Sequence, residues 1–108
     1  MRVDGTTVAN DWSDLTTNGL RATITLTERG MPARTSVQCG APAQAWAFSD
    51  TLLNGTVFEG FSSCSDWTGN GTVNGAVGDP TKTTEAWTRN CVGGGICGVP
   101  TSLYCFEQ

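Results

Sequence analysis

The segment that decides the interpretation of this chain is CSDWTGNGTVNGAVGDPTKTTEAWTRNC, residues 64–91. It has a cysteine at each end and a tryptophan just inside each cysteine, Trp67 and Trp87. Its other large apolar side chains are two valines, Val73 and Val77. Glycine, asparagine and threonine fill most of the rest, and this composition predicts a long irregular loop. A loop with so few apolar anchors would be mobile unless its ends were held.

Length and composition limit the class of protein. A chain of 108 residues predicts a single domain, 1–108, with one modest core. Low charge, 14 glycines and many threonines favour strands and ordered loops, so we expect an α+β, mostly β fold. Five cysteines in so short a chain predict an exported protein, extracellular or at a bacterial cell surface, in which disulfides supplement the core.

Charge and hydropathy exclude two classes of partner. The net charge is −4, and the six basic residues are scattered singly along the chain. Such a distribution provides no surface for a phosphate backbone, so we expect no nucleic-acid partner. No apolar run has the length needed to cross a bilayer, so we expect no membrane insertion.

The periodic patterns predict one short helix and several strands. Asn10 can cap a helical turn that places Trp12 and Leu15 on one side and stops at Asn18-Gly19. The alternation of RATITLTE, residues 21–28, gives the clearest strand. Further strands are expected at 46–48, 57–61 and 102–106.

The chain lacks the usual catalytic base. It contains no histidine, which excludes Ser-His-Asp and Cys-His catalysis and histidine-ligated zinc. The carboxylate pairs Asp11/Asp14 and Asp50/Glu59 could in principle hydrolyse glycosides, but solvated or capping acids are the simpler interpretation. We therefore predict that the protein is not an enzyme.

Metal binding has weak support in the sequence. The cysteine spacing contains no CxxC pair, so no metal site is predicted. The predicted loops nevertheless contain many oxygen-bearing side chains that suit calcium: Asp50, Asn54, Glu59, Asp66, Asn70, Asn74 and Asp79. Because these residue types also form turns and no EF-hand pattern occurs, we expect no cofactor, with calcium as the one candidate.

Four separated segments carry a resemblance to a known family. They are VDGTTVANDWSDL (3–15), CSDWT (64–68), EAWTRNC (85–91) and SLYCFEQ (102–108). Together they resemble the C-terminal part of a bacterial secreted and lipoprotein domain family of unknown function, which is itself similar to the C-type lectin-like and endostatin fold group. The resemblance implies a loop-rich, disulfide-stabilised antiparallel sheet with one short helix. It also implies that the chain is the C-terminal portion of a larger lectin-like domain.

The resemblance also implies a disulfide pattern. In such domains the two inner cysteines pair and pin the long loop, which implies a Cys64–Cys91 bridge. The family's last cysteine, here Cys105, pairs with an N-terminal partner, and this chain has no cysteine before Cys39. Cys39 and Cys97 lie in segments that resemble insertions, so the hypothesis is a second Cys39–Cys97 bridge with Cys105 unpaired or bonded to another chain. Spacing alone leaves other pairings open.

The functional expectation follows from this architecture. We expect a non-catalytic binding module that recognises a glycan or an extracellular protein through its long loop region. Trp67 would be a stacking surface, although core filling is the simpler role of such a tryptophan. The candidate ligand-binding residues are Asp66, Trp67, Asn70, Asn74 and Asp79. The Glu-Pro-Asn and Gln-Pro-Asp tripeptides of calcium-dependent lectins are absent, so their sugar chemistry is not carried over.

One alternative function belongs to another class. An exposed strand edge beside residues 102–106, together with Cys105, could join neighbouring chains. The protein would then be a structural or assembly subunit of a fibre or surface layer, with a second chain or a missing N-terminal segment as its partner.

Overall fold

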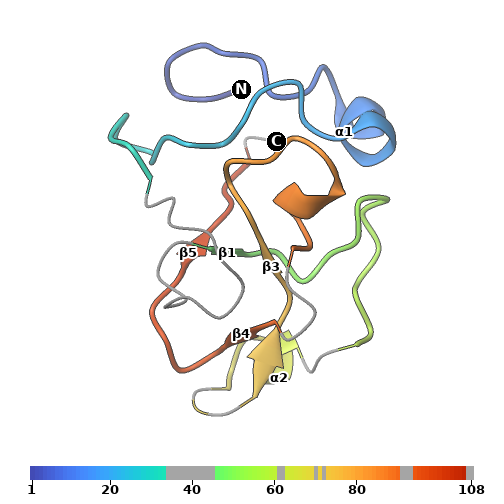
Figure 1. The fold of residues 1–108 in the computed structure, drawn as a ribbon, viewed down its shortest axis with the longest axis vertical. Coiled ribbons are helices and arrows are strands. Elements are labelled where there is room, and N and C mark those ends of the chain that lie inside the picture. Colours follow the sequence, from blue (N-terminus) through green and yellow to red (C-terminus); the bar gives the residue numbers. More distant parts are fainter. Residues whose placement is uncertain (34–45, 61–62, 70, 72, 91–93, 107–108) are drawn as a thin grey trace.

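Short elements joined by ordered turns make up the fold (Figure 1). The computed structural model describes residues 1–33, 46–60, 63–69, 71, 73–90 and 94–106. Its elements in chain order are α1 (Trp12–Asn18), β1 (Ala47–Phe48), α2 (Ser63–Asp66), β2 (Asn74–Gly75), β3 (Val77–Gly78), the 3₁₀ helix η2 (Glu85–Trp87), β4 (Gly95–Ile96) and β5 (Ser102–Leu103). The described residues therefore form an α+β fold with short helices and small sheets.

The central sheet has the order β3-β1-β5. Strand β1 pairs antiparallel with β3, with Phe48 opposite Val77, and parallel with β5, with Phe48 opposite Leu103. Strands β2 and β4 pair antiparallel in a second small sheet, with Asn74 opposite Ile96. The central sheet is therefore mixed, and the purely antiparallel sheet implied by the resemblance is wrong at β5.

The strand predicted at residues 21–28 is wrong. This segment forms one isolated bridge, from Leu26 to Pro32, because a tight turn starts at Thr27. The Thr27 N–H donates to the Met31 carbonyl at 2.8 Å, and the chain reverses before a strand can extend. Residues 22–27 are all half-buried, so the alternating pattern does not separate a buried face from an exposed one.

The other predicted strands are shorter than expected or reduced to a bridge. The segments at 46–48 and 102–106 contribute the two-residue strands β1 and β5. In the segment at 57–61, Val57 forms an isolated bridge with Thr51, and Phe61 lies outside the described residues.

Helix α1 forms where it was predicted, but its cap differs. Asp11, not Asn10, is the N-cap: its carboxylate accepts the Asp14 N–H at 2.8 Å. The Asn10 N–H donates in return to the Asp14 carboxylate at 2.9 Å, so two backbone donors at the helix start are satisfied reciprocally. Leu15 is buried, whereas Trp12 is exposed.

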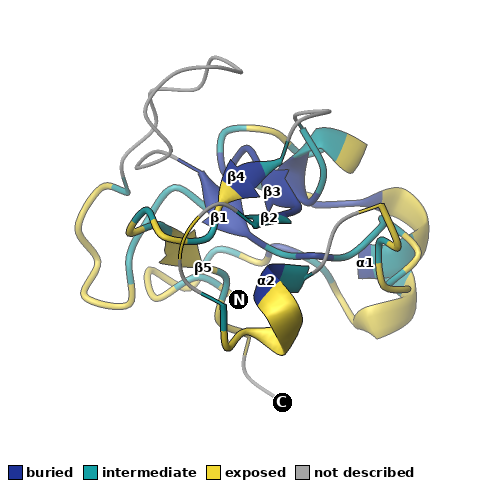
Figure 2. Ribbon diagram, turned by 90° about the horizontal axis from the view of Figure 1, so that it is seen from below, coloured by how far each residue is buried: buried dark blue, intermediate teal, exposed yellow. Residues whose placement is uncertain are grey.

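The segment predicted to be a loop contains the longest run of buried residues in the described part of the chain. Residues 75–80 are all buried, and β3 lies in the middle of them (Figure 2). A Cβ atom added to Gly78 would lie 1.7 Å from the Trp87 carbonyl oxygen. Glycine is thus required here because two backbones approach each other closely, and not because the chain turns.

Two hydrophobic clusters form the core. The first, which we call the disulfide cluster, consists of Trp46, Phe48, Cys64 and Val77, with Cys97 packed against it. The second, which we call the helix cluster, consists of Val8, Leu15, Leu20 and Trp87. Partly buried residues packed against the helix cluster are Ala9, Ile24, Leu53 and Tyr104. In Figure 1 the N-terminal segment and α1 lie at one end of the molecule, and α2 and β4 lie at the other.

The overall dimensions agree with a compact chain. The Cα radius of gyration is 13.1 Å, close to the value expected for about 100 compact residues. Among the described residues, no helix combines the length and the apolar character that crossing a membrane requires.

Candidate ligand-binding groove

A groove of about 310 Å³ lies between α1, β1 and the segment after β5. We call it the aromatic groove, because six aromatic side chains of the described residues line it: Trp12, Phe48, Trp67, Trp87, Tyr104 and Phe106. Among the described residues of the lining, none carries a formal charge at neutral pH. Leucines and three hydroxyl-bearing side chains, those of Thr16, Ser49 and Thr51, complete the wall.

Edge-to-face contacts fix the inner rings. Trp87, from η2, meets Tyr104 with ring centroids 5.3 Å apart and Phe106 at 6.1 Å. Phe48, from β1, meets Trp67 at 6.1 Å with the ring planes at 82°. Such pairs contribute about 0.5–1.5 kcal/mol each beyond the area they bury. The groove is therefore built on rings that already hold one another in place.

Two tryptophans of the groove are largely open to solvent. Trp12 is 65% exposed and Trp67 is 53% exposed. The Trp12 ring lies so close over Gly55 that a Cβ there would be 2.7 Å from Trp12 Cζ2. Exposed apolar side chains that occur together, as these two do on the wall of one groove, often mark a binding site.

The hydroxyl groups of the groove already donate to the protein. Ser49 Oγ donates to the Thr88 carbonyl, and Thr88 Oγ1 donates to the Thr51 carbonyl at 2.9 Å. Because Thr88 has used its single hydroxyl hydrogen, Thr51 Oγ1 is the donor in their 2.9 Å contact. Ser49 and Thr51 therefore keep oxygen lone pairs with which to accept hydrogen bonds from a ligand.

Tyr104 is held in its neutral form. Its hydroxyl donates to the Trp87 carbonyl at 2.6 Å. Burial raises the pKa of the Tyr104 phenol well above its usual value, and the negative charge of Asp79 raises this pKa further. The phenol therefore stays protonated over the physiological range.

Trp67 is presented by a backbone of unusual handedness. Residues 63–67, which include α2, all have φ between 47° and 65°, and none of them is glycine. We call this run the left-handed turn. The left-handed conformation costs an L-residue roughly 1–2 kcal/mol, so five consecutive residues need strong support from their surroundings.

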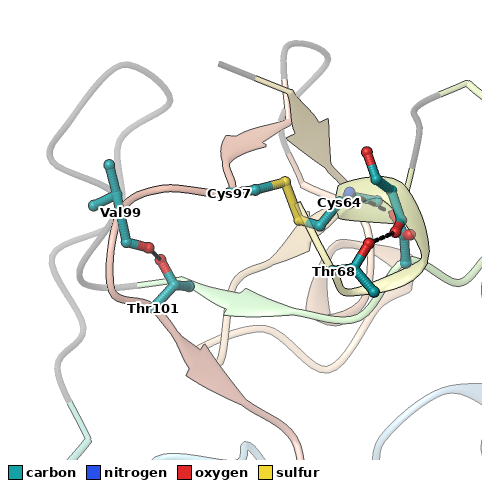
Figure 3. Close-up of a disulfide and its surroundings, with 8 residues drawn as sticks. Cys64, Thr68, Cys97, Val99 and Thr101 are labelled. Carbon is teal, nitrogen blue, oxygen red and sulfur yellow. Dashed lines mark hydrogen bonds between the residues drawn. A yellow bond between two sulfur atoms is a disulfide. The ribbon is translucent and has the colours of Figure 1, made fainter. Parts of the chain in front are cut away.

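A disulfide and local hydrogen bonds provide that support (Figure 3). Cys64, inside the turn, is bonded to Cys97, with the two Cα atoms 5.5 Å apart. The Gly69 N–H donates to the Cys64 carbonyl at 2.6 Å, and Thr68 Oγ1 donates to the Ser65 carbonyl at 2.6 Å. The hydrogen bonds hold the backbone of the turn locally, and the disulfide links the turn at Cys64 to Cys97, directly after β4.

The Cys64–Cys97 bond corrects the predicted pairing. Cys64 was expected to pair with Cys91, and Cys97 with Cys39, and both expectations are wrong because Cys64 and Cys97 are bonded to each other. Cys39 and Cys91 themselves lie outside the described residues. Within the described part of the chain, Cys105 has a free and exposed thiol, as expected.

Of the predicted site residues that the structure describes, Trp67 alone lines the aromatic groove. Asp66 and Trp67 are neighbours on the left-handed turn, and both are exposed. Asn74 is half-buried in β2. Asp79 is buried, and its carboxylate accepts the Thr81 N–H at 2.8 Å and the Thr81 hydroxyl at 2.6 Å. Asn70 lies outside the described residues.

Sequence reasoning missed most of the groove. Trp12 was placed on one side of the predicted helix with Leu15, without a role in binding, and Phe106 was treated as part of a strand.

Several carboxylates considered for catalysis or calcium make hydrogen bonds within the fold. Asp50 is buried and accepts the Ala76 N–H at 2.7 Å. Arg21 lies 2.7 Å from Asp14, and its hydrogen bond holds the pKa of Asp14 well below the usual range. In the described ranges, no three Cys, Asp or Glu side chains come together as a metal site would require.

A second, larger cleft of about 680 Å³ lies on the other side of the C-terminal segment. Its walls come from the N-terminal residues, from Ile24 and Leu26, and from Trp46 in the disulfide cluster. Leu103 and Phe106 line both this cleft and the aromatic groove, and Cys105 lies at its edge.

Comparisons with protein-family models, with curated proteins and with solved structures find no significant match to this chain.

Proposed function

We propose that the protein is a non-catalytic extracellular binding module that holds an uncharged glycan in the aromatic groove. The observation that carries this proposal is the pair of solvent-exposed rings, Trp12 and Trp67, on one groove with no formally charged residue in its described lining. Sugar rings present flat C–H faces that pack on aromatic surfaces, and their hydroxyl groups donate hydrogen bonds.

The polar chemistry of the groove supports the same class of ligand. Ser49 and Thr51 offer acceptor oxygens, because their own hydrogens are directed to protein atoms. A ligand rich in hydroxyl donors matches this wall. An anionic ligand would find no cation in the described lining, and the net charge of −4 would repel it.

The non-catalytic part of the proposal has a separate basis. The chain has no histidine, and no carboxylate or amine occurs in the described lining of the groove. General acid–base catalysis needs such a group within hydrogen-bonding distance of the substrate. In that described lining the one ionisable side chain, Tyr104, is held protonated.

The lectin-like kinship and the extracellular location belong to this proposal. Four sequence anchors support the kinship, and an α+β architecture with irregular connections is compatible with it. The Cys64–Cys97 disulfide supports an oxidising location, because such bonds are rare in reducing compartments.

A glycan array with the intact protein tests the proposal. We expect saturable binding to neutral glycans, with affinity at least about tenfold lower in Trp12→Ala and Trp67→Ala. Met31→Ala is the matched control, because Met31 is 63% exposed but lines neither cleft. Neutral-glycan binding that survives both tryptophan substitutions would place the site elsewhere, and retention of anionic glycans alone would contradict the proposal.

A structural or assembly role is the second candidate. Its support is the exposed Cys105 thiol beside β5, an outer strand of the central sheet whose Leu103 is 61% exposed. An exposed strand edge with an apolar residue is suited to pairing with another chain. A disulfide-linked ladder on a non-reducing gel that Cys105→Ala abolishes would favour this role over glycan recognition.

A further inference from the structure

We propose that the Cys64–Cys97 disulfide is a redox-sensitive switch for the aromatic groove: its reduction releases the left-handed turn and removes Trp67 from the groove wall. The effect on ligand binding rests on the proposed function. The conformational change does not, and it can be measured without a ligand.

The first step is the conformational preference of the turn. Residues 63–67 hold five consecutive positive φ angles without a glycine, an arrangement that L-residues adopt only when the surroundings impose it. Cys64 is the one residue of the turn that is covalently tied to a distant segment. Once the disulfide is reduced, local steric clashes favour right-handed or extended backbone at each of the five positions.

The second step is the connection to the groove. Trp67 is the last residue of the turn, and its N–H donates to the Ser63 carbonyl at 2.9 Å. Its ring meets Phe48 edge-on and lines the aromatic groove. A change of backbone handedness between Ser63 and Trp67 redirects the Trp67 side chain, because the Cα–Cβ direction follows φ and ψ.

The third step is chemical access. Cys64 is buried, whereas Cys97 is half-buried, so an attacking thiolate reaches the Cys97 sulfur first. The electrons come from a dithiol reductant. One of its thiolates bonds to Cys97 Sγ, and Cys64 leaves as a thiolate that takes up a proton. The second thiol of the reductant then displaces Cys97 as a thiol, and the reductant ends as its own disulfide.

Amide hydrogen exchange tests the switch. We would compare the oxidised protein with a Cys64→Ala/Cys97→Ala variant, both without ligand. In the variant we expect hydrogen exchange at least about tenfold faster at the Trp67 and Gly69 amides. Both amides donate hydrogen bonds to carbonyl groups of the turn. The Leu20 and Arg21 amides, bonded to the Thr83 and Val8 carbonyls beside the helix cluster, should keep their protection.

A glycine substitution separates release of the turn from mere loss of a cross-link. Glycine adopts positive φ without steric cost, so Ser65→Gly in the double-alanine background should restore part of the protection at Trp67 and Gly69. If the double variant does not fold, wild-type protein titrated with dithiothreitol provides the same comparison, with Leu20 and Arg21 as monitors of global folding.

Three results would overturn the proposal. They are unchanged exchange at Trp67 and Gly69 after the bond is removed, equal loss of protection at Leu20 and Arg21, and no effect of Ser65→Gly. Glycan affinity is measured separately, so the absence of any glycan ligand would contradict the proposed function while the exchange result still decides the switch.

Discussion

The disulfide cluster and the helix cluster stabilise their surroundings by different means. In the helix cluster, Leu15 and Trp87 are contributed by a capped helix and a 3₁₀ turn, both in ordinary right-handed conformations. In the disulfide cluster, Cys64 lies in a left-handed turn and is held by a covalent bond to Cys97. The difference indicates that a covalent cross-link stabilises the turn, whose backbone is left-handed. Side-chain packing is sufficient for the two helices, whose backbone is right-handed.

The largest effect is expected between the two clusters, at Gly78. A Cβ there would lie 1.7 Å from the Trp87 carbonyl oxygen and 2.9 Å from Thr88 Cα, so backbone must move. We expect Gly78→Ala to lower the free energy of unfolding by more than about 4 kcal/mol, beyond the usual range for overpacking. Gly5→Ala is the control for backbone strain without a clash: a Cβ at Gly5 meets nothing within 4 Å, but its φ is +83°, so this substitution should cost about 1–2 kcal/mol. Chemical denaturation of both variants checks this, and equal losses would contradict the close-packing account.

The next effect concerns the disulfide cluster alone. Removing the Cys64–Cys97 bond, which spans a sequence separation of 33, should cost about 3–4 kcal/mol in the chain-entropy model. Denaturation of Cys64→Ala/Cys97→Ala against wild type measures the loss. Cys105→Ala, which removes an exposed free thiol, should be nearly neutral. A double variant as stable as wild type would mean that packing alone holds this cluster.

A smaller, pH-dependent effect is expected beside the helix cluster. Tyr104→Phe leaves the Trp87 carbonyl without its phenol donor and should cost about 1 kcal/mol at neutral pH. The folded-state pKa of Tyr104 is raised, whereas an unfolded tyrosine ionises near pH ~10. The unfolded state therefore loses its proton first as pH rises, so the contribution of Tyr104 is full below that pH and declines above it.

Thermal unfolding of wild type and Tyr104→Phe at neutral pH and above pH ~10 measures this contribution. The difference in melting temperature between wild type and Tyr104→Phe should become smaller above that pH. Because Tyr104 is the only tyrosine in the chain, no other phenol contributes to this change. If the difference in melting temperature grew with pH, the phenol would ionise more readily in the folded protein than in the unfolded chain.

The smallest effect has the opposite sign. Ser65→Gly relieves left-handed strain, partly offset by the greater freedom of glycine in the unfolded chain, and should stabilise the protein by about 0.5–1 kcal/mol. Ser13→Gly is the matched control, because Ser13 is exposed on the right-handed helix α1, where glycine should cost about 1 kcal/mol. If both substitutions destabilised the protein equally, the turn would not be strained as described.

Local patterns predicted the parts of the fold that local interactions decide. The helix at α1 and the segments of β1 and β5 were predicted because capping residues and apolar runs mark them directly. The RATITLTE alternation failed because a turn at Thr27 prevents the pairing that a strand needs. The composition of residues 75–80 predicted a loop, because close backbone contacts at Gly78 leave no apolar periodicity to detect.

The candidate site was predictable only in part. Trp67 was selected for its position beside Cys64, and it does line the groove. Asp79 was predicted to offer its carboxylate oxygens to a ligand from a loop. It is instead buried and hydrogen-bonded to Thr81, because the surrounding segment belongs to the core. Trp12 and Trp67 line the same groove because two distant segments pack together, and no local sequence pattern predicts such packing.

Disulfide mapping of the unreduced protein tests the central claim most directly. After proteolysis, we expect the peptide that contains Cys64 to be linked to the peptide that contains Cys97, and Cys105 to react with an alkylating reagent before any reduction. A Cys64–Cys91 or Cys64–Cys105 link would contradict the account. The left-handed turn and the placement of Trp67 in the groove would then lose their support.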